Sequence, residues 1–171
     1  MKKEKKVVLT MAIVMTAMFV GWIVIRINKG LTFEYGCDAY IKRAADSNTV
    51  DLALENLEIA IDYAERNKLT EGVVSIFFMN PKNDIEFWHR NLVACKEELQ
   101  NLPADSSQLE QTNVLMKLRE SLTDDGESST KVTVPDGISI YPYNVIFFWW
   151  SIISAIGLCV FWIWLIPESW L

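Results

Sequence analysis

The stretch Val145–Ile166, VIFFWWSIISAIGLCVFWIWLI, contains 22 residues and no charge. A second uncharged stretch, Val7–Ile25, reads VVLTMAIVMTAMFVGWIVI. The hydrocarbon core of a bilayer is about 30 Å thick, and a helix of about 20 apolar residues crosses it. A charge inside that core costs about 2.5 kcal/mol or more. Both stretches therefore predict membrane-spanning helices surrounded by lipid.

The two predicted spans divide the chain into six parts. We expect a mainly α protein in which N- and C-terminal transmembrane helices flank an antiparallel helical bundle, with a small β-hairpin before the second span. The parts are a basic flank (1–6), the first span (7–25), the bundle domain (30–126), a linker with the hairpin (127–143), the second span (145–166) and a short tail (167–171).

The first span predicts an uncleaved anchor. It is longer than the apolar region of a secretory signal, and no small-x-small cleavage site follows it. Four lysines precede it, whereas the tail after the second span has none. Lysine and arginine near a span favour the cytoplasmic side. We expect an integral protein of a bacterial-type inner or plasma membrane, with cytoplasmic termini and an extracytoplasmic domain.

Charge is distributed unevenly along the chain. Residues 1–29 carry six Lys/Arg and one Glu, whereas residues 30–143 carry ten Lys/Arg and twenty Asp/Glu. Binding of nucleic acid depends on basic residues that neutralise phosphates. The acidic domain therefore argues against a nucleic-acid partner.

Four segments of the domain have helical periodicity. Ser47–Thr49 supplies N-cap residues for the second segment, Pro103 ends the third, and Ser107 with Glu110 matches a capping box at the start of the fourth. Amphipathic helices joined by short links predict an antiparallel bundle. The segments are 32–45, 50–67, 85–102 and 107–122.

Two further stretches do not follow that period. Val73–Met79 is apolar and rich in β-branched and aromatic residues, so it predicts either a strand or a buried helical turn. Lys131–Val134 and Ile138–Tyr141 flank Pro135-Asp136-Gly137, which predicts a β-hairpin. The polar residues 123–130 between the bundle and this hairpin predict a flexible link.

Small residues and indoles mark surfaces of the two spans. Small side chains let helices approach closely in lipid. The candidate packing or partner contacts are Ala17, Gly21, Ser151, Ser154, Ala155 and Cys159. The indoles near both ends of the second span, Trp149, Trp150, Trp162 and Trp164, predict anchoring at the two membrane–water interfaces.

Residues that carry catalytic or metal chemistry are sparse. Glu86 and His89 form a Glu-x-x-His step, but a di-iron bundle needs a second such step and the chain has one histidine. We therefore expect a partly exposed histidine and no metal site. Cys37 and Cys95 fall on predicted core faces, as buried thiols or as a disulfide. No phosphate loop or nucleophile elbow occurs, so we expect neither a cofactor nor an enzyme.

These observations favour a non-catalytic membrane-anchored interaction protein, an accessory or sensor subunit of a larger membrane complex. Its partners are expected to be other membrane-protein subunits or further copies of itself. Phe77, Phe78 and Trp88 are the candidate contacts on the domain. The alternative is a homo-oligomeric two-span channel, with Thr10, Thr16, Ser151 and Ser154 around a pore.

Overall fold

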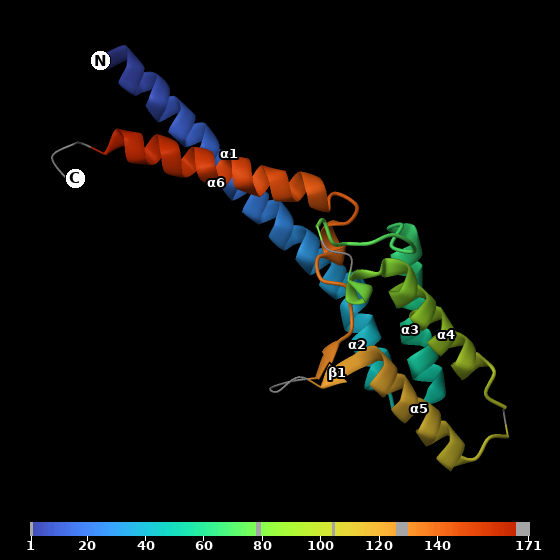
Figure 1. The fold of residues 1–171 in the computed structure, drawn as a ribbon. Helices are drawn as coiled ribbons and strands as arrows, with labels where there is room; N and C mark the ends of the chain where they lie inside the picture. The colour runs from blue at the N-terminus through green and yellow to red at the C-terminus, as the bar shows by residue number, and fades with distance from the viewer. Residues whose placement is uncertain (1, 78–79, 104, 126–129, 167–171) are drawn as a thin grey trace.

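The protein is mainly helical, with one small antiparallel sheet of two strands (Figure 1). The computed structural model describes residues 2–77, 80–103, 105–125 and 130–166. Two long helices lie side by side at one end of the molecule, and the remaining elements form a bundle at the other end. The elements are α1 (Lys2–Phe33), η1 (Glu34–Asp38), α2 (Ala39–Ala45), α3 (Val50–Arg66), η2 (Pro81–Asn83), α4 (Ile85–Gln100), α5 (Gln108–Leu122), β1 (Thr123–Asp125), β2 (Thr130–Val132), η3 (Ile138–Ile140) and α6 (Asn144–Leu165).

The first long helix continues into the bundle without a break. The sequence predicts a separate helix from residue 32, which is wrong: α1 passes through the π-helical turn η1 directly into α2. A Cβ at Gly36 in this turn would lie 2.4 Å from Tyr63 Cε2 of α3. Glycine therefore lets the two helices approach closely at this point. The continuous helix mechanically joins the apolar part of α1 to the core of the domain.

Helices α3, α4 and α5 begin where their capping residues indicate. Thr49 accepts a hydrogen bond from the backbone N–H of Leu52, and Asp84 accepts one from Phe87. At α5 the predicted capping box is confirmed, since Ser107 and Glu110 accept each other's backbone N–H groups.

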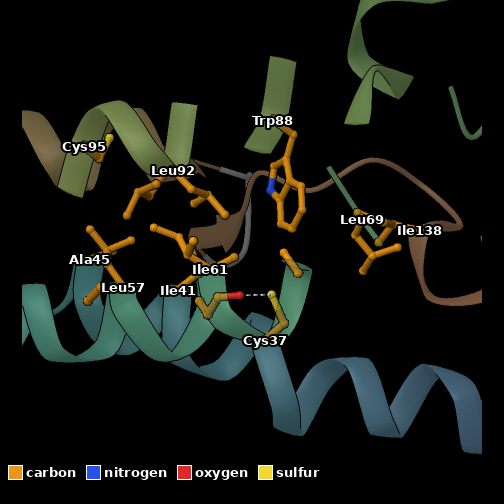
Figure 2. Close-up of a cluster of buried hydrophobic side chains, with 14 of the residues drawn as sticks. Cys37, Ile41, Ala45, Leu57, Ile61, Leu69, Trp88, Leu92, Cys95 and Ile138 are labelled. Carbon is orange, nitrogen blue, oxygen red and sulfur yellow. Dashed lines mark hydrogen bonds between the residues drawn. The ribbon is translucent and has the colours of Figure 1, made fainter. Parts of the chain in front are cut away.

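One apolar core joins these helices with α2 and the connecting segments. Its buried members at the centre include Ile41, Leu57, Ile85 and Leu92. Figure 2 shows the side chains of Ile41, Leu57 and Leu92 gathered between α2, α3 and α4. Leu109, in the first turn of α5, is 71% exposed. The core-facing part of α5 is its C-terminal half, where Leu118 and Leu122 are buried.

The predicted β-hairpin is misplaced. Strand β2 pairs with β1, with Thr123 opposite Val132, so the predicted link supplies the first strand. Gly137 does form the expected turn, with φ +87°, but Ile138–Ile140 is a 3₁₀ turn. The N–H group of Ile138 donates to the carbonyl oxygen of Pro135, and that of Ile140 donates to the carbonyl oxygen of Gly137. These two N–H groups therefore do not pair with a neighbouring strand.

The described part of the apolar stretch Val73–Met79, residues 73–77, forms neither of the two predicted structures. Val73 makes a single antiparallel bridge with Asp84, and the described residues after it are irregular. Val74 donates its backbone N–H to Asn83, and Ile85 donates to Gly72. The segment therefore pairs with the residues that lead into α4, and Met79 lies outside the described residues.

The two long helices are apolar over most of their length. The helix from Lys3 to Ala45 and the helix α6 are each long and apolar enough to cross a membrane. They run antiparallel, so that the start of α1 and the end of α6 lie at the same end of the molecule (Figure 1). The rest of the chain buries only a small share of the most apolar stretch of each helix.

Candidate functional site

Three indole hydrogen bonds join α1 to α6. Trp22 Nε1 donates to the carbonyl oxygen of Phe147 at 3.0 Å, and Trp150 Nε1 donates to that of Met18 at 3.1 Å. Trp162 Nε1 donates to Thr16 Oγ1 at 3.0 Å. An indole N–H in apolar surroundings needs a protein acceptor. Two of the indoles predicted as interfacial anchors, Trp150 and Trp162, therefore act as interhelical donors. The same role of Trp22 was not predicted, because its acceptor lies far along the chain.

Small residues of α6 lie at this contact. Ser154 is fully buried, and a Cβ at Gly157 would lie 2.7 Å from the sulfur of Met15. Ser154 and Gly157 are about one helical turn apart, so both lie on the side of α6 that packs on α1. Ser151 and Ala155 are partly exposed and Cys159 is exposed. Of the predicted small-residue stripe on α6, Ser154 has the deepest position.

The predicted small-residue step on α1 lies on the other face. Ala12 is fully buried on the side of α1 that packs against α6. Gly21 follows Ala12 by nine residues, which is two and a half turns, and so faces the opposite direction. Ala17 is exposed, and a Cβ at Gly21 would meet nothing within 4 Å. Ala17 and Gly21 form an open step, which we call the outer face of α1.

The hydroxyl groups expected around a pore bond to their own helices. Thr10 donates to the carbonyl oxygen of Lys6 and Thr16 to that of Ala12. Ser151 donates to Phe148, and Ser154 donates to Trp150 at 2.7 Å. Each of these hydroxyl groups thus donates its hydrogen to a carbonyl oxygen of its own helix.

Phe77 and Trp88, two of the three aromatic residues proposed as domain contacts, do not share one surface. Phe77 is 63% exposed, and its ring packs edge-on against Phe148 of α6 at 5.0 Å between centroids. Trp88 is 6% exposed and packs in the core against Phe33. The indole of Trp88 extends from α4 onto the core. The prediction that Trp88 contacts a partner is therefore corrected, because its side chain is buried. Phe78 lies outside the described residues.

Both domain cysteines are free and buried. Cys37 Sγ donates to the carbonyl oxygen of Ala60 at 3.6 Å, and Figure 2 shows Cys95 at a separate place in the core. Burial, with a smaller effect of Asp38, raises the pKa of the Cys37 thiol to about 12. Burial also raises the pKa of Cys95. Both groups are therefore neutral thiols at physiological pH and poor nucleophiles.

His89 has one acidic neighbour. Its Nε2 lies 3.9 Å from Glu65 Oε1, and its side chain is 14% exposed. His89 is therefore partly exposed, as predicted, with most of its side chain covered by neighbouring residues. Across the described ranges, no group of three or more His, Cys, Asp or Glu side chains is arranged to hold a metal ion.

A pocket of about 530 Å³ opens where the apolar parts of α1 and α6 meet the domain. It is bounded by the last turns of α1, the end of α3 with the loop after it, and the segment that leads into α6. Three basic side chains line it, Lys29, Arg66 and Lys68, with one acidic side chain, Glu71. The sequence pattern does not reveal this cluster, because Lys29 is far along the chain from the other two.

Comparison of the chain with protein-family models, with curated proteins and with solved structures finds no match.

Proposed function

We propose that this chain is a non-catalytic, membrane-anchored accessory or sensor subunit that docks onto other membrane proteins through the outer face of α1. Helices α1 and α6 cross the membrane as an antiparallel pair, with both termini on the cytoplasmic side. The helical domain then lies outside the cytoplasm, above an inner or plasma membrane.

The observation that carries this proposal is the division of α1 into two faces. One face packs on α6 and receives the indole hydrogen bonds of Trp150 and Trp162. The other presents Ala17 and Gly21, with open space above Gly21. Small residues on a lipid-facing surface permit a close approach by another helix, which is where packing in lipid is most favourable.

The continuity of α1 with η1 and α2 supports a coupling role. The outer face and the core of the domain belong to the same unbroken helix, because η1 joins α1 to α2. Cys37 and Ile41, both fully buried, fix this helix in the core. Displacement of the outer face by a partner helix would therefore be transmitted to the domain.

The test is purification of the tagged protein in mild detergent. We expect a stoichiometric partner that is lost from Gly21→Leu, because leucine fills the space that a partner helix would use. Val20→Leu is the matched control, since it enlarges an exposed side chain about 100° around the helix. Recovery of the unaltered protein as a monomer, or equal partner yield from both variants, would contradict the proposal.

A further inference from the structure

The basic side chains of the pocket beneath α6 are unusual in an acidic domain. Residues 30–143 carry twice as many acidic as basic residues, yet this pocket has three basic side chains and one acidic one. They come from separate parts of the chain: Lys29 from α1, Arg66 from the last turn of α3, and Lys68 from the following loop. The fold therefore concentrates positive charge at one place.

These cations are available to a ligand. Neither Lys29 nor Lys68 has a carboxylate within ion-pair distance among the residues that the structure places. Arg66 Nη2 lies 3.8 Å from Asp62 Oδ2, its Nε donates to the carbonyl oxygen of Asp62 at 3.1 Å, and both side chains are 70% exposed. A pair as exposed as this one contributes little, so the guanidinium group can exchange it for a stronger anion.

The backbone holds Lys68 in place at the pocket. Lys68 has a left-handed conformation, with φ +57°, immediately after α3. The N–H of Leu69 donates to the carbonyl oxygen of Ala64 at 2.8 Å, and Leu69 is 3% exposed. This is the hydrogen bond of a Schellman cap. The cap and the buried leucine together fix the residue from which the Lys68 side chain extends.

The pocket also lies at the depth of lipid headgroups if α1 and α6 cross the membrane. The uncharged part of α1 ends at Ile25, and Lys29 lies about 6 Å further along the helix axis. Tyr143, which lines the pocket, directly precedes α6. A headgroup layer is about 5–8 Å thick on each side of the hydrocarbon core. Lys29 and Tyr143 are therefore both within reach of a phosphate in that layer.

We propose that this pocket binds the headgroup of an anionic phospholipid of the phosphatidylglycerol type. Lys29, Arg66 and Lys68 surround the phosphate, where ammonium and guanidinium groups make charge-assisted hydrogen bonds. Ser139 and Tyr143 also line the pocket, and their hydroxyl groups can hydrogen-bond to the glycerol of the headgroup. Glu71 excludes a second negative charge from the same space, which favours a singly charged headgroup.

The inference rests on the proposed membrane insertion and is tested on the full chain in detergent. Native mass spectrometry gives the Kd of the first bound phosphatidylglycerol and of the first bound phosphatidylcholine. The test variant is Lys29→Gln/Lys68→Gln. The control, Lys82→Gln/Lys131→Gln, removes the same charge from a different pocket.

We expect the unaltered protein and the control to prefer phosphatidylglycerol, and the test variant to lose at least about fivefold of that preference, the effect of one basic residue at an anionic surface. An equal preference for phosphatidylglycerol over phosphatidylcholine in the two double variants overturns the inference. So does binding of glycerol 1-phosphate as tightly as the lipid, which would indicate a soluble phosphate ligand. Release of the protein from membranes by alkaline carbonate would instead overturn the proposed insertion, so the two failures are distinguishable.

Discussion

Gly36→Ala is expected to destabilise the folded domain, although alanine favours helices over glycine. A Cβ at this position would lie 2.4 Å from Cε2 and 2.6 Å from Cδ2 of Tyr63. Ordinary contacts begin near 3.4 Å, so the ring must move by about 1 Å. That ring packs edge-on against Phe33, at 6.0 Å between centroids, and cannot move without losing this contact.

The expected magnitude follows from two opposing effects. Overpacking costs about 1–3 kcal/mol, whereas replacing glycine by alanine in a helix gains about 1 kcal/mol. The net loss for Gly36→Ala is therefore up to about 2 kcal/mol. Gly30→Ala is the matched control, because a Cβ there meets nothing within 4 Å, and it should gain about 1 kcal/mol.

The assay is urea unfolding of the full chain in mild detergent, followed by far-ultraviolet circular dichroism. Adding Tyr63→Ala to Gly36→Ala removes the clash, so the double-mutant cycle should show a favourable coupling of about 1 kcal/mol or more. Equal stabilisation by Gly36→Ala and Gly30→Ala, with no coupling to Tyr63, would refute the close approach of η1 to α3.

Three further predictions concern the core and its ionisable groups. Leu57→Ala should cost about 2–5 kcal/mol in urea unfolding because Leu57 is fully buried, whereas Leu109→Ala, at an exposed site, should stay within about 0.5 kcal/mol; similar losses would contradict the core. Cys37, with its pKa raised to about 12, should resist maleimide at neutral pH until the protein is unfolded, and labelling of the folded domain at this thiol would argue against its burial. Burial, and then the charge of Glu34, raise the pKa of Asp38 against the opposing effect of Lys42, so the folded state binds this proton more tightly and loses stability as the pH rises through the folded pKa. Asp38→Asn should therefore raise the thermal midpoint at pH 7, with an advantage that shrinks as the pH falls toward 3.8; an advantage that grows instead would show the opposite shift.

Local sequence signals predicted the helices of the domain well. The capping box of Ser107 and the helical periodicity that ends before Pro103 placed α5 and α4 correctly, because caps and apolar periodicity act over a few residues. The turn at Gly137 was also predicted, but its flanking residues do not pair. Ile138 and Ile140 are buried in a 3₁₀ turn, and burial of both outweighed the strand preference of their side chains.

The features on which the proposed function depends are formed by contacts between residues that are far apart in the sequence. The join of α1 to α2 depends on Gly36 meeting Tyr63, and no local pattern marks that approach. The indole of Trp22 finds its acceptor at Phe147, on the other long helix. The basic pocket combines Lys29 with the end of α3. Composition predicted two long apolar helices and their small residues, but not which faces of those helices pack together.

Photocrosslinking from α1 tests most directly whether the outer face binds a partner helix. Val14 is 44% exposed and lies about 20° from Gly21 around the helix, whereas Val20, 51% exposed, lies about 120° away from Val14. A photoreactive residue at position 14 should form a discrete protein adduct in native membranes, and one at position 20 should give mainly lipid adducts. Protein adducts of equal yield at both positions, or lipid adducts alone at position 14, would contradict docking through this face.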